Sequence, residues 1–253
     1  MATTNLSVER ALIILRHLSR TDQGMGIREL SRELGISPAG VQKIMNALHI
    51  QGFVAQNEQD KRYTLGPDVL RIGLAMLSRL EVRRVAHPFL ASLAEATGET
   101  AFLGIRDSDD VFYIDKVLPD VDIRMDATLG LTRPYNCTAV GKMILAHLPA
   151  DDMKRLVAAD RLVQATANSI TDPVQLTDEL EIIRQRGYAL DREEFKPGIY
   201  CVAAPIHDHN SQLVAAITVA GPAGRIQANL DPIIEQVLTK SQEISTQLGY
   251  NIT

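Results

Sequence analysis

The sequence has only two cysteines and no long apolar run. Cys137 and Cys201 lie far apart, so they match neither a metal-binding spacing nor a disulfide framework. No apolar run approaches the roughly 18 to 20 residues that cross a bilayer, and the first residues, MATTNLSVER, lack the apolar core of a signal peptide. We therefore expect a cytoplasmic protein without a membrane segment.

Common catalytic patterns are missing as well. The sequence contains neither G-x-S-x-G nor H-E-x-x-H, and the residues around Gly141 do not complete a phosphate-binding loop. Cys201 falls in a predicted strand, and His207 follows it at a distance of about 20 Å at the rise of a strand, which is too far to activate the thiol. We interpret Cys201 as a small buried side chain, and we expect no enzyme activity, cofactor or metal.

The composition is that of a globular protein with two regions of opposite charge. At 253 residues the chain has room for about two domains, and its 45% hydrophobic and 23% charged residues are ordinary for a soluble protein. Up to Arg84 the chain has 12 Lys and Arg against 8 Asp and Glu, a balance of +4, whereas the remainder has 14 against 23, a balance of −9. We expect only the basic first third to approach phosphates.

Two short amphipathic helices are predicted between Ile27 and Leu48. Apolar residues recur there at intervals of three and four, namely Ile27, Leu30 and Leu34, then Val41, Ile44, Met45 and Leu48. Gly35 is placed to end the first helix with a positive φ, and Ser37 is placed to cap the second before Pro38. This pattern is typical of a helix-turn-helix, whose second helix enters the DNA major groove. A helical hairpin without DNA contacts is the alternative.

The flanking segments extend this unit to a winged helix. Residues 7–19 predict a helix capped by Ser7, with an apolar face that includes Val8 and Leu12. After Gly52, short strands at 53–55 and 63–65 flank a polar tip. A hairpin in this place is a wing, and its Lys61 and Arg62 are expected on DNA phosphates or in the minor groove. An ordinary surface hairpin is the alternative.

The rest of the chain predicts a linker helix and an α+β domain with an antiparallel sheet. Residues 68–84 carry a wide apolar stripe, which indicates burial against the chain's own domains or a second subunit. Further helices are expected at 88–97, 138–147, 151–159, 173–187 and 231–248, and strands at 100–106, 111–117, 123–126, 188–192, 199–206 and 213–220. We place the domains at 1–66, 67–85 and 86–253.

A ligand site is predicted where small residues begin a helix. The segment from Asn136 to Gly141 leaves backbone N–H groups accessible at a helix start, which suits a carboxylate. A helix packed closely on a sheet is the alternative. Asp191 ends a predicted strand beside a loop that contains glycine, a common place for ligand contacts. By spacing alone, solvation is the default for this carboxylate.

Many segments, in order, match one family. The sequence resembles the IclR family of bacterial transcriptional regulators over nearly its whole length, through SVERALIIL, IRELSRELGIS, VQKIMNALHIQGFV, RYTLGP, ETAFLGIR, VFYIDKV, CTAVGKMILA, RQRGYALDREEF, CVAAPIHD and LVAAITVAGP. The resemblance implies an N-terminal winged helix-turn-helix, a linker helix and a C-terminal GAF/profilin-like effector-binding domain. It further implies a homodimer or homotetramer that binds a double-stranded DNA operator and responds to a small organic or aromatic acid.

The resemblance also implies which residues form the effector site. By matching motif these are Met125, Thr138, Ala139, Val140, Asp191, Ile199, Cys201 and Thr218. It gives Asp191 and Cys201 a role that composition and spacing alone do not assign to them.

In one place the sequence departs from the family. Its recognition helix begins Pro38-Ala39-Gly40, where the family usually has basic and hydroxyl residues, so these positions offer no side-chain donors. Gln suits adenine and Lys suits guanine in the major groove. The expected DNA-binding residues are therefore Gln42, Lys43 and Asn46 for bases, and Ser37, Lys61 and Arg62 for the backbone.

These observations predict a DNA-binding transcriptional regulator whose operator binding changes when a small acid binds the C-terminal domain. Two alternatives belong to other classes. One is an enzyme that acts on a small organic acid and carries an accessory helix-turn-helix. The other is a protein–protein module that uses the helical hairpin.

Overall fold

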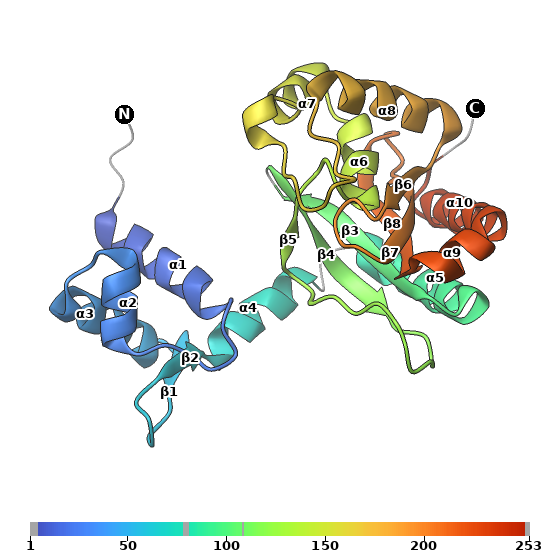
Figure 1. The fold of residues 1–253 in the computed structure, drawn as a ribbon. Coiled ribbons are helices and arrows are strands. Elements are labelled where there is room, and N and C mark those ends of the chain that lie inside the picture. The colour runs from blue at the N-terminus through green and yellow to red at the C-terminus, as the bar shows by residue number, and fades with distance from the viewer. Residues whose placement is uncertain (1–4, 78–80, 108, 251–253) are drawn as a thin grey trace. The chain divides into compact units, whose positions relative to one another are not determined.

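The computed structural model describes residues 5–77, 81–107 and 109–250. The chain divides into two compact units, Met1–Arg79 and Leu80–Thr253, and each is described by itself (Figure 1). Within the described residues, no helix is long and apolar enough to cross a membrane.

The first unit is the expected winged helix. Three helices, α1 (Leu6–Leu18), α2 (Ile27–Leu34) and α3 (Pro38–Ile50), precede an antiparallel hairpin of β1 (Val54–Gln56) and β2 (Tyr63–Leu65), and α4 (Pro67–Leu77) follows. A further bridge pairs Met25 with Tyr63, which ties the hairpin to the segment before α2. The buried core of this unit draws on all three helices and both strands, and includes Ile14, Leu18, Leu30, Val41, Met45, Val54 and Tyr63.

The turn between α2 and α3 forms as the sequence predicts. Gly35 has a φ of 63°, in the left-handed region that favours glycine. Ser37 caps α3 by accepting a hydrogen bond from the Gly40 N–H at 3.2 Å, and Pro38 is the first residue of the helix.

The predicted cap of α1 is wrong. The helix begins at Leu6, and the side chain of Asn5 caps it by accepting a hydrogen bond from the N–H of Ser7 at 3.1 Å, so Ser7 is not the cap. Asn is among the strongest N-cap residues. Val8 and Leu12 do lie on one apolar face with Leu15, but both are more than half exposed, because this face lines an open groove beside α3.

The second unit is built on a six-stranded antiparallel sheet, which confirms the α+β class. The strands are β3 (Thr100–Asp107), β4 (Asp110–Val117), β5 (Thr132–Arg133), β6 (Ala189–Arg192), β7 (Ile199–His207) and β8 (Leu213–Pro222). Their order in the sheet is β5-β4-β3-β8-β7-β6, and every neighbouring pair is antiparallel. The predicted strand at 123–126 is wrong, because the Met125 carbonyl accepts its hydrogen bond from the Thr100 hydroxyl and not from a sheet ladder.

Helices cover both faces of this sheet. On one face lie α5 (Glu81–Thr97) and α10 (Leu230–Gln247), and on the other lies α6 (Ala139–Ala146), with α8 (Pro173–Arg186) packed outside it (Figure 1). All residues of α6 are buried. The short helices α7 (Ala150–Leu156) and α9 (Ala223–Ala228) and a 3₁₀ turn at Ala159–Arg161 complete the unit. The side chain of Asp172 caps α8, and Gly187 follows its end with a φ of 80°.

The helix predicted to start at Pro88 starts earlier. α5 begins at Glu81 and continues through Pro88, so the expected domain boundary at 85/86 falls inside it. The buried stripe of α5 runs across the proline as Val85, Ala86, Leu90, Leu93 and Ala94. Burying one large aliphatic side chain stabilises the fold by about 1.5–3 kcal/mol, and a proline inside a helix costs about 3 kcal/mol. Burial of several such side chains therefore outweighs the cost of Pro88, and the helix continues through it. Residues 78–80, within the predicted linker helix, lie outside the described residues.

Candidate functional sites

The exposed face of α3 carries the predicted base-contacting side chains. Gln42, Lys43 and Asn46 are all exposed. Gln42 Nε2 donates a hydrogen bond to Asn46 Oδ1 at 2.8 Å, as expected for residues four apart on a helix. Lys43 lies to one side of this pair, where it lines a groove between α1 and α3. The helix thus presents an amide pair with free donors and acceptors, and a separate cation beside it.

Arg62 of the wing already has partners inside its own unit. Its guanidinium donates to the carbonyls of Gln23 and Gly24 at 2.7–3.1 Å, and it pairs with the Glu29 carboxylate of α2 at 2.8 Å. These contacts hold the hairpin against the loop before α2. Lys61, in contrast, is exposed at the tip. The structure therefore gives Arg62 a positioning role, and its contact with DNA stays a prediction.

Three of the predicted effector residues share one face of the sheet. Asp191 of β6 is paired with Cys201 of β7, and Ala203 of β7 is paired with Thr218 of β8. Because side chains two residues apart on a strand point to the same face, Asp191, Cys201 and Thr218 all point toward the layer of α6. Cys201 belongs to the same buried cluster as the residues of α6.

The first turn of α6 lies on this face with unused backbone donors. Thr138 caps the helix: its hydroxyl accepts a hydrogen bond from the Gly141 N–H and donates one to the Pro134 carbonyl, both at 3.0 Å. The N–H groups of Ala139 and Val140 donate no hydrogen bond to any described residue. Since a helix N-terminus carries partial positive charge, these two N–H groups can bind an anion.

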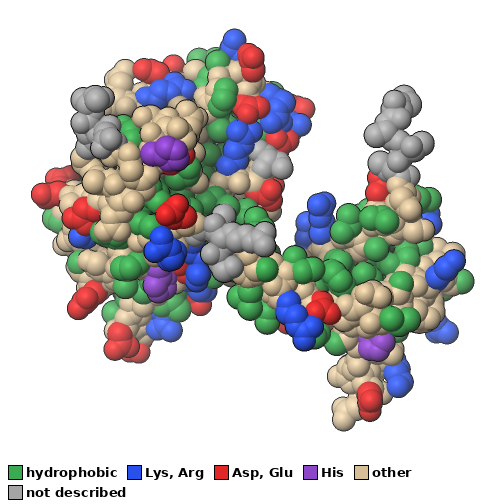
Figure 2. Space-filling view, turned by 180° about the vertical axis from the view of Figure 1, so that it is seen from behind, with side chains coloured by type: hydrophobic (Ala, Val, Ile, Leu, Met, Phe, Trp, Pro, Cys, Tyr) green, Lys and Arg blue, Asp and Glu red, His purple; other side chains and the backbone are tan. Residues whose placement is uncertain are grey.

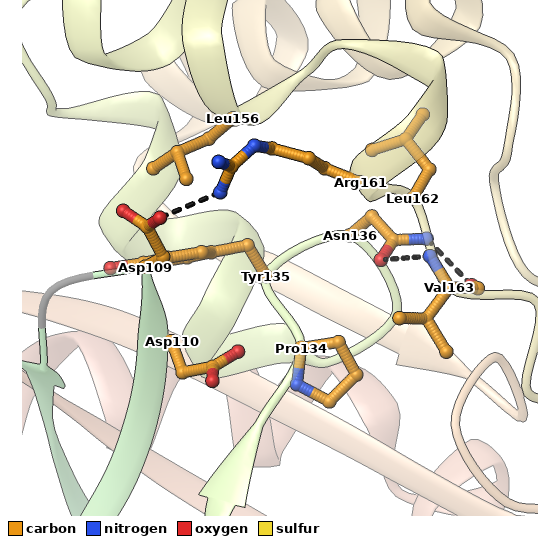
Figure 3. A pocket seen from close by; sticks show the side chains of 9 residues that line it. All are labelled: Asp109, Asp110, Pro134, Tyr135, Asn136, Leu156, Arg161, Leu162 and Val163. Atoms are coloured by element: carbon orange, nitrogen blue, oxygen red, sulfur yellow. Dashed lines mark hydrogen bonds and ion pairs between the residues drawn. The ribbon is translucent and has the colours of Figure 1, made fainter.

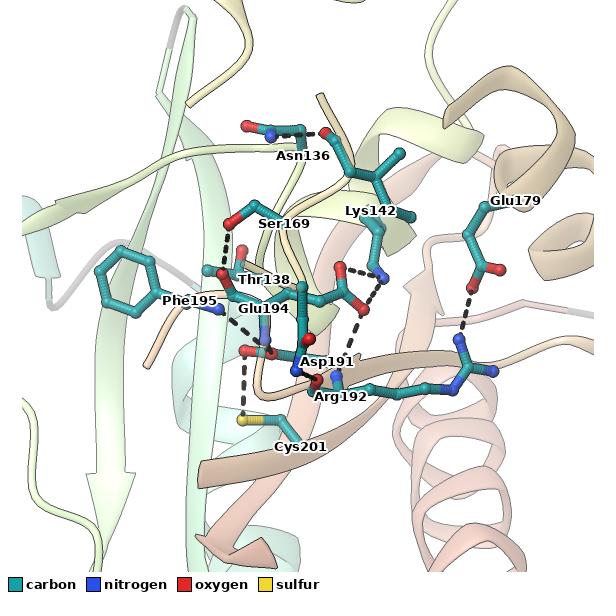
Figure 4. A network of polar contacts seen from close by, with 12 residues as sticks. Asn136, Thr138, Lys142, Ser169, Glu179, Asp191, Arg192, Glu194, Phe195 and Cys201 are labelled. Carbon is teal, nitrogen blue, oxygen red and sulfur yellow. Dashed lines mark hydrogen bonds and ion pairs between the residues drawn. The ribbon is translucent and has the colours of Figure 1, made fainter. Parts of the chain in front are cut away.

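Asp191 is buried in a network of polar contacts (Figure 4). Its Oδ1 accepts hydrogen bonds from the N–H groups of Glu194 at 2.7 Å and Phe195 at 3.4 Å, and the Cys201 thiol donates to its Oδ2 at 3.8 Å. Burial raises the pKa of Asp191 to about 7, in spite of these donors. Burial also raises the pKa of the Cys201 thiol, so this cysteine stays protonated and is not a nucleophile.

A buried ion pair adjoins this network through Glu194. Lys142 of α6 lies 2.5 and 2.6 Å from the two carboxylate oxygens of Glu194, and both side chains are almost completely buried (Figure 4). The Glu194 carbonyl accepts hydrogen bonds from the hydroxyls of Thr166 and Ser169. The loop after β6 is thereby fastened to α6, and Lys142 is neutralised by its partner.

The other predicted effector residues have different surroundings. Met125 is half-buried, and Arg225 fastens its loop by donating to the Ile123 carbonyl at 2.8 Å while it pairs with Glu99. Ile199 is half-buried at the start of β7. Thr218 is fully buried, and its hydroxyl donates to the Val202 carbonyl at 2.8 Å. The structure thus brings Asp191, Cys201 and the start of α6 together. The Thr218 hydroxyl is already hydrogen-bonded within the sheet.

A separate cavity of about 220 Å³ lies near the start of β4 (Figure 3). Asp109 at its rim is paired with Arg161 and Arg155, both at 2.6 Å. The Asn136 side chain donates hydrogen bonds to the carbonyls of Val163 and Ile170 and accepts one from the N–H of Val163. None of the predicted effector residues lines it. Its Asp109, Arg161 and Asn136 side chains therefore already have partners within the chain.

Two family models match the chain and together span both units. Residues 7–58 match the IclR helix-turn-helix domain, and residues 74–246 match the C-terminal domain of the bacterial transcriptional regulator IclR. The chain belongs to the IclR family. Its relatives include the HTH-type transcriptional regulator BhcR of Paracoccus denitrificans, 35% identical over 240 residues, which are 94% of this chain and 86% of BhcR. The glycerol operon regulatory protein of Streptomyces coelicolor is 32% identical over 252 residues, 98% of each chain.

Solved structures of IclR proteins have the same fold. The Thermotoga maritima IclR structure matches with a TM-score of 0.77 and 35% identity, over 96% of this chain and 99% of that one. An IclR transcriptional regulator from Alicyclobacillus acidocaldarius matches with a TM-score of 0.85 and 26% identity, over 98% of each chain. This IclR-family chain is therefore a DNA-binding transcriptional regulator with a C-terminal effector domain, and it is not an enzyme.

Sequence reasoning missed two features of the effector domain. Lys142 in the apolar run of α6 is a visible signal for a buried cation, because a lysine is almost never fully buried without a partner, but its partner Glu194 is distant in the chain. Nothing in the sequence marks Tyr113 of β4. The strand register alone places it on the face of the sheet that α6 covers. Within the described ranges, no cluster of His, Cys, Asp and Glu side chains could hold a metal ion.

Proposed function

We propose that this IclR-family regulator binds a small carboxylate at the start of α6. The observation that carries the proposal is the pair of unused N–H groups of Ala139 and Val140, on the same face as Asp191 and Cys201. Two convergent N–H groups at a helix N-terminus suit the two oxygens of a carboxylate. Thr138 fixes the turn that aims them, through its hydrogen bonds to Gly141 and Pro134.

The charges around the start of α6 are compatible with a small acid as the ligand. Lys142, the buried cation of this network, is already paired with Glu194, whereas the N–H groups of Ala139 and Val140 are unused donors for an anion. A carboxylate beside Asp191 is tolerated when Asp191 is neutral, and burial favours its neutral form by raising its pKa to about 7. Met125, Ile199 and Thr218 supply apolar surface around the ligand.

A thermal-shift screen of small carboxylates tests this effector site. A bound acid raises the melting temperature of the second unit by mass action. We expect a shift for at least one acid, and a smaller shift in Thr138→Val, which loses the cap that orients the N–H groups. Thr177→Val is the matched control, because this threonine is exposed on α8. Equal shifts in both variants, or no shift with any acid, would remove the support for the site.

We further propose that α4 assembles the protein into a homodimer, or into a homotetramer of two such dimers. Four of its apolar side chains, Leu70, Ile72, Leu74 and Met76, are more than half exposed, and Figure 2 shows green side chains along this segment. A second copy would cover this surface and would provide the second reading head that a two-fold operator needs. Sedimentation of Ile72→Glu should give monomers, whereas Arg71→Ala should keep the assembly.

Operator binding is proposed to use α3 and the wing together. Gln42 and Asn46 are placed to read adenine from their shared stripe, Lys43 to read guanine beside it, and Ser37, Lys61 and Arg62 to hold the phosphates. Fluorescence anisotropy with the DNA upstream of the chain's own gene tests this assignment. Affinity should fall steeply with salt, and Lys43→Ala should weaken it, while Lys154→Ala on α7 of the second unit should not.

A further inference from the structure

The cavity near the start of β4 is lined by two polar side chains that have no partner (Figure 3). Tyr135 is only 5% exposed, and its buried hydroxyl is hydrogen-bonded to no described residue. Asp110 is half-buried, and its carboxylate forms no ion pair or hydrogen bond with a described residue. Because a buried tyrosine hydroxyl usually has a partner, a molecule from outside the chain is the natural partner for both groups.

The pairing of β4 with β5 brings these side chains together. The antiparallel ladder ends toward the cavity at the pair of Val111 and Arg133. Tyr135, two residues beyond Arg133, therefore comes alongside Asp109 and Asp110, which precede Val111. All three residues line the cavity, and Figure 3 shows them together at its β4 end. The strand register thus places the tyrosine hydroxyl and the carboxylate in one site.

The unpaired charge in this cavity is negative. Asp109 is paired with both Arg155 and Arg161, each at 2.6 Å, whereas Asp110 is paired with neither arginine. Burial, together with the negative charges of Asp107 and Asp109, raises the pKa of Asp110. A bound anion would add to this unfavourable negative charge, and a bound cation would compensate it.

The rest of the lining is mainly apolar. It is formed by Pro134, Leu156, Leu162 and Val163, and the Asn136 side chain holds it in place through its hydrogen bonds to the backbone of Val163. The cavity volume of about 220 Å³ equals that of about seven water molecules at roughly 30 Å³ each. The cavity therefore has room for one charged group and a short hydrocarbon body.

We propose that this cavity is a second ligand site, which binds a small primary amine as its ammonium ion. An ammonium has three donors and no acceptor, so it can donate to the Asp110 carboxylate and to the Tyr135 hydroxyl oxygen at once. An alcohol of the same shape brings no charge to Asp110, and an acid would place a second carboxylate beside it. Since none of the predicted effector residues lines the cavity, this proposal and the carboxylate site at α6 can fail independently.

Matched amines and alcohols test this site. Isothermal titration calorimetry of the full chain at pH 7 compares butylamine with 1-butanol, cyclohexylamine with cyclohexanol, and benzylamine with benzyl alcohol. For at least one pair, the wild type should bind the amine more tightly than the alcohol. Asp110→Asn should weaken binding of that amine about 10- to 150-fold, the value of a hydrogen bond to a charged group, and Tyr135→Phe about 2- to 12-fold, the value of a neutral one. Asp178→Asn and Tyr188→Phe, which do not line the cavity, are the matched controls.

A measurement on the wild type alone locates the bound amine and does not depend on how the variants fold. In protein with ¹³C-labelled leucine and valine methyl groups, the resonances of Leu156, Leu162 and Val163 should shift more with the amine than with its alcohol at equal concentration. The proposal is refuted if no amine of the panel binds, if each alcohol binds as tightly as its amine, if Asp110→Asn keeps the full affinity, or if the shifts fall on other methyl groups. Full affinity in Tyr135→Phe alone would refute the contact with Tyr135.

Discussion

Replacement of Asp191 by Asn should remove a large pH dependence of stability from the second unit. The Asp191 carboxyl is 3% exposed, and burial raises its pKa from 3.8 to about 7. Well below pH 3.8 both the folded and unfolded states carry the proton, and the contribution of this group to stability is complete. As the pH rises toward 7, the unfolded state ionises first, so stability is lost until the folded state also ionises. The full loss is about 4 kcal/mol, at 1.36 kcal/mol for each pKa unit.

The Asn variant is a close match in shape. Its side-chain oxygen can still accept the hydrogen bonds that Asp191 Oδ1 accepts from the N–H groups of Glu194 and Phe195, but it does not titrate. The difference in unfolding free energy between wild type and variant should therefore change by about 2–3 kcal/mol between pH 5 and pH 8, in favour of the variant at high pH.

Urea unfolding followed by circular dichroism measures this difference at each pH. Asp178→Asn serves as the control, because Asp178 is exposed on α8 and its variant should follow the wild-type curve at every pH. Parallel curves for wild type and Asp191→Asn would refute the reasoning, since they would mean that Asp191 has the same pKa in the folded and unfolded chain. A larger stability of the wild type at pH 8 would refute it as well.

Three further predictions concern the supports of the two sites. Ser37→Ala should lower the stability of the first unit by about 1 kcal/mol in urea unfolding, because it removes the cap of α3, while Ser37→Asp should keep it. Arg62→Ala should weaken binding to all DNA sequences alike in anisotropy titrations, and Arg62→Lys should not restore it, because one ammonium cannot replace the forked contacts to the loop and to Glu29. Lys142→Met should cost about 3–5 kcal/mol in unfolding free energy by leaving Glu194 buried without a partner, and adding Glu194→Gln should recover much of it.

The sequence predicts the elements whose signals are local. Gly35, Ser37 and Asp172 mark helix ends by their own backbone and capping chemistry, and each acts as its type predicts. The failures occur where tertiary packing overrides a local signal. Pro88 looks like a helix start, but a continuous buried stripe carries α5 through it. Ser7 is a good cap, but Asn5, two residues before it, is as good and stands directly before Leu6, the first residue of the helix.

The effector site shows the same limit more clearly. Asp191 looks like a solvated carboxylate, since its burial depends on the pairing of β6 with β7 and on α6, which covers this face of the sheet. The contacts of Lys142 with Glu194 join residues far apart in the chain. The candidate site residues can be named from the sequence only through its resemblance to a family.

We expect a small acid bound in the second unit to change how tightly the first unit binds DNA. The most direct measurement is the anisotropy-derived dissociation constant for the upstream DNA, with and without an acid that the thermal-shift screen has identified. We expect salt-sensitive binding whose dissociation constant changes about 5- to 150-fold with the acid, the range of typical coupling energies, and a much smaller change in Thr138→Val. A dissociation constant that stays the same with the acid, although calorimetry shows the acid bound, would mean that this acid does not regulate DNA binding.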